Sequence, residues 1–185
     1  MSSAKTVFVT GAAGNLGRAI AAAFEQRGAN LVLVARTKES LAAALGTESE
    51  RRVFIAADLL DQGAIDWAVR LTRERFGRLD ILCNIAGGFK MGPPVHETSD
   101  KDWDFLMDIN ARTMLHAVRA AVPQMIDAGG GKIVNVGAFA AQKGVAQMGA
   151  TYLSTYSCIA AIRSSRSTPR GIVALLKQAI LGISP

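Results

Sequence analysis

Residues Thr10–Gly17 read Thr-Gly-Ala-Ala-Gly-Asn-Leu-Gly and directly follow the apolar run Val7-Phe8-Val9. That run favours a buried strand. After the glycines, apolar residues recur at helical spacing, at Leu16, Ala19, Ile20, Ala23 and Phe24. A glycine turn between a strand and a helix lets backbone N–H groups approach an anion, and the helix N-terminus adds unpaired donors and partial positive charge. The stretch therefore predicts a site for the pyrophosphate of a dinucleotide, and a tight turn without a ligand is the alternative.

Strands and helices are predicted to alternate over most of the chain. Further strands are predicted at residues 31–35, 53–57, 79–83 and 133–136, and helices at residues 41–45, 65–76 and 99–128. The longest helix begins with the capping-box spacing of Ser99 and Asp102 and ends at Gly129-Gly130-Gly131. Right-handed crossovers between such strands favour an α/β fold, a Rossmann-like doubly wound parallel sheet with helices on both faces.

The size and composition of the chain are those of a globular protein. It has 185 residues, of which 50% are hydrophobic, and no apolar stretch approaches the length of a membrane span. The first residues run almost at once into the predicted strand, which leaves no room for a signal peptide. Cys83 and Cys158 lie far apart and suggest a reducing compartment. We therefore expect a cytoplasmic protein that does not enter a membrane.

The net charge of +6 does not by itself indicate nucleic-acid binding. Residues 151–185 supply +4 of it, because they contain four basic side chains and neither Asp nor Glu. No basic helix with interleaved aromatic residues occurs, so we expect no nucleic-acid partner. His96 and His116 lack metal-ligand spacing, so we expect structural or surface roles for both and no metal site.

Five motifs, in order along the chain, resemble the short-chain dehydrogenase/reductase family. They are Thr10–Gly17, Asp58 within Ala56-Ala57-Asp58-Leu59, Asn84-Ile85-Ala86-Gly87, Asn110 within Asp108-Ile109-Asn110, and Lys132-Ile133-Val134-Asn135-Val136. The resemblance covers roughly residues 5–150. It implies an oxidoreductase that transfers hydride between NAD(P) and a small-molecule carbonyl or alcohol substrate, whose identity the sequence does not reveal.

The resemblance also implies a set of cofactor-binding residues, namely Gly11, Ala13, Asn15, Leu16, Gly17, Arg36, Asp58, Asn84, Ala86 and Gly87. In the family, the residue at the Asp58 position lies against the adenine ring; a loop cap is the alternative role. Asn84 has the alternative role of a turn former. The predicted second strand ends in Ala35-Arg36-Thr37, where NAD-binding sites usually place a carboxylate. Arg36 can pair with a phosphate, so we expect NADP rather than NAD, although Arg36 could also be a surface charge.

The catalytic residues that the family uses are incomplete in this sequence. The resemblance assigns Asn110 to a proton relay and Tyr152 to the acid/base position, but Tyr156 stands four residues after Tyr152, where the family has lysine. Ala138 occupies the position of the family's serine, and no Tyr-x-x-x-Lys occurs in the chain. We therefore expect impaired hydride transfer. The alternatives are a catalytically silent NADP-binding protein and a non-functional fragment of a longer reductase.

The chain changes character near Thr151. Nine of the last 35 residues are Ser or Thr, and acidic residues vanish. We expect a dinucleotide-binding domain over residues 1–150 and an atypical tail over residues 151–185, produced by truncation or a reading-frame change, with a diverged tail as the alternative. Residues 172–183 predict one buried helix or strand, but neither of the family's last two strands can be identified after Gly171, so the sheet should be incomplete there. The family resemblance implies a possible homo-oligomer through the Ser99–Ala128 helix.

Overall fold

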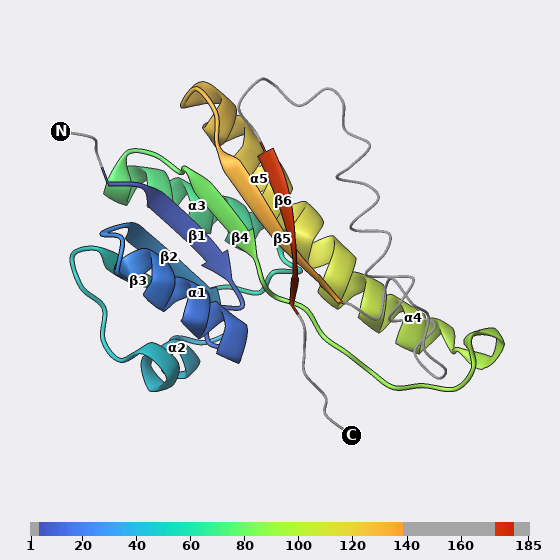
Figure 1. Cartoon of the computed structure of the whole chain (residues 1–185). Coiled ribbons are helices and arrows are strands. Elements are labelled where there is room, and N and C mark those ends of the chain that lie inside the picture. The colour runs from blue at the N-terminus through green and yellow to red at the C-terminus, as the bar shows by residue number, and fades with distance from the viewer. Residues whose placement is uncertain (1–3, 139–172, 180–185) are drawn as a thin grey trace.

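The computed structural model describes residues 4–138 and 173–179, which form one parallel sheet with helices on both faces (Figure 1). Its strands are β1 (Thr6–Thr10), β2 (Asn30–Ala35), β3 (Arg52–Ala56), β4 (Ile81–Asn84), β5 (Lys132–Ala138) and β6 (Val173–Ala179). The strand order is β3-β2-β1-β4-β5-β6, and each neighbouring pair is parallel. This arrangement confirms the predicted doubly wound fold.

The helices agree with the predicted pattern except in the longest segment. They are α1 (Asn15–Glu25), α2 (Lys38–Leu45), α3 (Gln62–Phe76), the short 3-10 helix η1 (Val95–Glu97), α4 (Asp100–Met107) and α5 (Thr113–Asp127). A π-helical turn, η2 (Asp108–Arg112), joins α4 to α5. The single helix predicted over residues 99–128 is therefore interrupted where the backbone takes up one extra residue per turn. Within the described residues, no helix is both long enough and apolar enough to cross a bilayer.

The apolar strands are buried on both faces of the sheet. Phe8 packs with α3 and α5 on one face, whereas Val7 and Val9 pack with α1 and α2 on the other. Figure 1 shows the two pairs of helices in front of and behind the strands. Burial on both faces explains why these strands read as continuous apolar runs rather than alternating ones. Cys83 lies in this core, where burial raises the pKa of its thiol to about 12.

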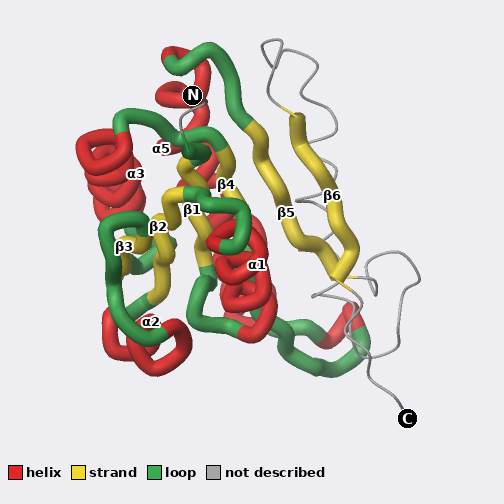
Figure 2. Tube along the Cα trace, turned by 60° about the vertical axis from the view of Figure 1, so that its left-hand side comes forward, coloured by secondary structure: helices red, strands yellow, loops and turns green. Residues whose placement is uncertain are grey.

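The sheet continues past β5. β6 pairs in parallel with β5, from Lys132 opposite Val173 to Ala138 opposite Ala179 (Figure 2). Of the two structures predicted for residues 172–183, the strand is the one found. Of the family's last two strands, the described residues contain this one, so the expectation that the sheet is incomplete at its C-terminal side stays a prediction.

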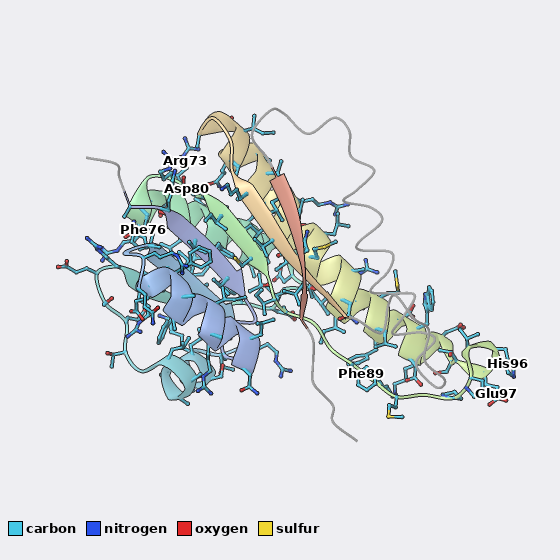
Figure 3. All side chains as sticks on the ribbon, viewed as in Figure 1. Arg73, Phe76, Asp80, Phe89, His96 and Glu97 are labelled. Carbon is cyan, nitrogen blue, oxygen red and sulfur yellow. The ribbon has the colours of Figure 1, made fainter. Side chains whose placement is uncertain are left out.

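Asp80 links the amino ends of the central strands through hydrogen bonds. Its carboxylate accepts hydrogen bonds from Lys5 Nζ at 2.8 Å and Thr6 N at 3.0 Å, and Arg78 Nη2 lies 2.7 Å away. Burial alone would raise the pKa of Asp80, but these donors outweigh it and hold the pKa below its usual value. Figure 3 shows Asp80 at the opposite end of the molecule from Phe89, which follows the carboxyl end of β4.

Candidate functional site

Two glycines shape the turn between β1 and α1, and a third leaves it open. Gly11 has a φ of 64°, and a Cβ there would lie 2.8 Å from Ala86 N. A Cβ on Gly17 would lie 2.3 Å from Gly11 O, so the start of α1 can pack on the turn only without a side chain. Gly14 is exposed, and a Cβ there would meet nothing closer than 3.4 Å. Gly11 and Gly17 are therefore required by the fold, whereas Gly14 keeps the surface above the turn clear.

The N-terminus of α1 carries no side-chain cap. Gly14 is its N-cap residue, so no side chain accepts a hydrogen bond from the first-turn N–H groups. By contrast, α2, α3 and α4 are capped by the side chains of Thr37, Asp61 and Ser99. An uncapped first turn with exposed residues presents unpaired donors and the positive end of the helix dipole to solvent. This end of α1 can therefore accept an anion.

Thr10 joins the glycine turn to the loop after β4. Its Oγ1 accepts hydrogen bonds from Ile85 N at 3.1 Å and Ala86 N at 3.2 Å, and donates to Cys83 O at 3.4 Å. These bonds place Ile85 and Ala86 beside the turn. Thr10 is not among the site residues that the sequence predicts, although its position at the carboxyl end of the first strand indicates such a role.

Asn84 is the last residue of β4 and faces β5. Its side chain is 5% exposed, and Nδ2 donates to Asn135 Oδ1 at 2.8 Å. Among the described residues, neither Asn84 Oδ1 nor Asn135 Nδ2 has a hydrogen-bond partner. Asn84 is therefore a buried strand residue rather than a turn former, and its contact with a cofactor stays a prediction.

Asn110 lies in the π-helical turn and fixes the loop after β4. Its Oδ1 accepts a hydrogen bond from Gly88 N at 2.9 Å, and its Nδ2 donates to Gly88 O at 3.0 Å. The turn itself is supported by Thr113, whose N–H bonds to Asp108 O and whose Oγ1 donates to Ile109 O at 2.9 Å. Single π turns inside helices occur frequently at functional sites. Asn110 thus lies beside the predicted cofactor loop, and its relay role stays a prediction.

Asp58 and Arg36 follow two neighbouring strands, β3 and β2. Asp58 Oδ1 accepts a hydrogen bond from Leu60 N at 2.9 Å, so the loop-capping role is present. The adenine contact stays a prediction. Arg36 is exposed, and within residues 4–138 and 173–179 it has no ion-pair or hydrogen-bond partner. Its guanidinium is therefore available to an anion. It lies at the carboxyl ends of the strands, as the glycine turn does.

The two histidines lie in different surroundings. His116 is buried, with Nδ1 3.0 Å from Leu59 O. His96 is exposed beside Glu97, at 3.4 Å, on the tip next to α4 (Figure 3). In the described part of the chain, no cluster of His, Cys, Asp and Glu has a geometry that could hold a metal ion.

Tyr152 and the predicted boundary near residue 150 lie outside the described residues. Ala138 ends β5, next to that segment. The structure thus brings together the glycine turn, the loop after β4 and Asn110, and it does not describe how Tyr152 is placed.

The comparisons with known proteins agree on one family. The short chain dehydrogenase family model matches residues 5–162. The D-threitol dehydrogenase of Mycolicibacterium smegmatis is 38% identical over 140 residues, which are 74% of this chain and 54% of that protein. Oxidoreductase UcpA of Escherichia coli is 36% identical over 132 residues, 70% of this chain and 50% of that protein. The chain thus spans about half the length of these curated relatives.

Solved structures share the fold. A metagenomic short-chain oxidoreductase in complex with NADP matches with a TM-score of 0.84 and 30% identity, over 95% of this chain and 82% of that one. An NAD+-bound xylitol dehydrogenase matches with a TM-score of 0.84 and 27% identity, over 95% and 70% of the two chains. Together with the sheet order and the turn after β1, these matches show that the chain belongs to the short-chain dehydrogenase family.

Proposed function

We propose that this protein binds NADP through the turn between β1 and α1, and that its hydride transfer with a carbonyl or alcohol substrate is severely impaired. The observation that carries the binding proposal is the uncapped first turn of α1 above Gly14. A pyrophosphate is the anion that suits a strand–glycine turn–helix of this kind. Gly11, Ala13, Asn15, Leu16 and Gly17 would surround it.

Arg36 supports NADP over NAD. It stands directly after β2 with no carboxylate beside it, and its side chain is exposed. A guanidinium there can form paired hydrogen bonds with the 2′-phosphate, whereas an NAD site would present an acidic residue to the ribose hydroxyl. One of the matched structures holds NADP and another NAD+, so the family alone does not decide the choice.

The remaining cofactor residues would lie along the same edge of the sheet. Asp58 would contact adenine, and Asn84, Ala86 and Gly87 would line the other end of the cofactor. Carboxyl ends of parallel strands meet at one edge, which is where doubly wound sheets bind ligands. The bonds from Thr10 and Asn110 hold the loop after β4 against this edge.

The nicotinamide of a bound cofactor would supply or accept the hydride, and the protein would have to handle the proton. We assign that proton to Tyr152, with Asn110 holding a relay water. A free tyrosine titrates near 10 and needs a neighbouring cation to act near neutrality, yet Tyr156 stands where the family has lysine. The methyl side chain of Ala138 cannot donate a hydrogen bond to a carbonyl. Losing both groups should cost several orders of magnitude in rate, at about 10²–10⁴-fold each.

A catalytically silent NADP-binding protein is the second candidate. It is favoured by the contrast between an intact glycine turn and an incomplete set of catalytic residues in the same sequence. A fluorescence titration with NADPH, followed by turnover assays on ketones and alcohols with the same sample, separates the two. Binding with slow turnover supports impaired catalysis, and binding without turnover supports the silent protein. A lack of binding contradicts both.

We also propose that α4 and α5 form a contact between two copies of the chain. Trp103, Phe105 and Leu115 on these helices expose 38%, 46% and 43% of their surface. Light scattering of the purified protein should show a dimer or larger species, and Phe105→Ser should shift it toward monomer.

We place the protein in the cytoplasm, which cell fractionation can test. We also propose that the tail from about Thr151 reflects truncation or a reading-frame change, which peptide sequencing of the native protein can test.

A further inference from the structure

We infer that His116, on α5, is a positioning residue that holds the adenine side of the cofactor site by donating a hydrogen bond to the carbonyl of Leu59. The inference rests on the proposed function, because it needs NADP to lie along the edge where Asp58 and the glycine turn meet. The cofactor-binding residues proposed above do not include His116.

The geometry fixes what the imidazole does. His116 is 8% exposed, and its Nδ1 lies 3.0 Å from Leu59 O. A carbonyl oxygen can only accept, so Nδ1 must carry the proton. Leu59 directly follows Asp58, the residue proposed to contact adenine. The side chain of His116 therefore determines where that loop lies relative to α5.

Within the loop, the other bonds are local. Asp58 Oδ1 accepts from Leu60 N, Asp58 O accepts from Asp61 N, and Asp61 caps α3. These contacts set the shape of the loop but do not attach it to another part of the fold. In the described part of the chain, His116 gives the one side-chain hydrogen bond that joins residues 58–61 to a distant element.

Gln62 provides a second link at the same place. Its Nε2 donates to His116 O at 3.2 Å and to Asp66 Oδ1 at 2.9 Å. The first residue of α3 is thus attached to the backbone of His116 while the loop just before α3 is attached to its ring. Both links meet at one residue of α5, so the loop has a fixed register against that helix.

One continuous helical segment therefore holds both loops of the proposed site. Asn110 binds the backbone of Gly88 after β4, and His116, six residues later, binds Leu59 after β3. Loss of the His116 donor should release the adenine-side loop without changing the glycine turn or Arg36. NAD and NADP share the adenine ring, so both should lose affinity equally.

The test uses calorimetric titrations of the whole chain with NADP and with NAD. His116→Leu removes the donor, and we expect it to weaken both cofactors by about tenfold with an unchanged affinity ratio. His116→Asn keeps an N–H near the position of Nδ1 and should restore affinity to within about twofold of the original chain. The matched control is Thr72→Val, which removes a buried hydroxyl bonded to Ala68 O at 2.8 Å in α3, away from the loop. It should leave both affinities unchanged.

The outcomes separate this inference from the proposed function. If the unchanged chain binds neither cofactor, the proposed function fails and this inference with it. If it binds NADP but folded His116→Leu binds equally well, the inference alone is overturned. If His116→Leu does not fold, ¹⁵N NMR of the His116 ring decides: a protonated Nδ1 whose signal shifts on adding NADP supports the inference. A ring protonated only at Nε2, or one that does not respond to NADP, overturns it.

Discussion

The side-chain amide of Asn110 pairs with both backbone groups of Gly88, accepting from N at 2.9 Å and donating to O at 3.0 Å. Asn110→Asp cannot make the second bond and would place its charge beside the Gly88 carbonyl. We expect a loss of about 1–2 kcal/mol in the free energy of unfolding, because the half-buried carbonyl of Gly88 loses its donor. Urea unfolding measures the loss, and hydrogen exchange at the Gly88 amide should become faster. Unchanged stability and exchange would show that this pair does not fix the loop.

Gly17 and Gly14 should respond differently to the addition of a methyl group. Gly17→Ala would place Cβ 2.3 Å from Gly11 O and 2.7 Å from Ala12 Cα, both backbone atoms. We expect about 1–3 kcal/mol of destabilisation from this overpacking. Gly14→Ala has room and a φ of −75°, so its free energy of unfolding should change by less than about 0.5 kcal/mol. It should nevertheless weaken NADP binding, because the methyl group would occupy the surface left clear for the pyrophosphate.

Thermal unfolding and calorimetric titration of the same two proteins check this pair. Equal destabilisation by both substitutions would contradict the assignment of Gly17 to packing. Full NADP affinity in Gly14→Ala would contradict the assignment of Gly14 to the anion.

Arg36→Ala should separate the two cofactors. The variant loses the proposed partner of the 2′-phosphate, so its affinity for NADP should fall by about tenfold or more while its affinity for NAD stays the same. The control is Arg27→Ala, which makes the same change in net charge at the C-terminal end of α1, where Arg27 bonds to Ala23 O. Equal losses for NADP and NAD in Arg36→Ala would reject the NADP preference.

Asp80 should make stability depend on acid pH. Although burial acts to raise its pKa, the bonds from Lys5, Thr6 and Arg78 lower it below its unfolded value of about 3.9. The stabilisation is therefore complete above the unfolded pKa and is lost as pH falls through the lower, folded pKa. Asp80→Asn should lose roughly 2 kcal/mol of unfolding free energy at pH 7 and show a shallower decline below about pH 4.

Urea unfolding from pH 3 to pH 7 measures this dependence. The control is Glu74→Gln, which breaks an exposed pair with Arg70 at 3.9 Å and should change stability by less than about 0.5 kcal/mol. Parallel pH curves for Asp80→Asn and the unchanged protein would refute the role of Asp80.

Much of the sheet could be predicted because its signals are local. Val7-Phe8-Val9 and the glycines after them specify a strand, a turn and a helix within 25 residues, and α1 forms where its apolar spacing indicates. The sequence also predicts a helix cap at Ser99, and Ser99 Oγ accepts a hydrogen bond from Asp102 N at 3.2 Å. Among the contacts of the described residues there is no return bond from the Ser99 amide to the Asp102 carboxylate, which pairs with Lys90.

The features that the sequence did not reveal depend on distant residues. Apolar spacing through residues 99–128 is compatible with a continuous α-helix, so nothing in it marks the π turn at Asn110. The bonds of Thr10 to Ile85 and of His116 to Leu59 join residues 75 and 57 positions apart. Such contacts follow from strand register and helix packing, which no local pattern determines.

The most direct test of the proposed site is an NMR titration of the backbone amides with NADP. If the uncapped first turn of α1 holds the pyrophosphate, the largest shifts should fall on Ala13–Gly17, with saturation at lower concentration for NADP than for NAD. Binding that leaves these amides unmoved, or no binding of either cofactor, would contradict the account.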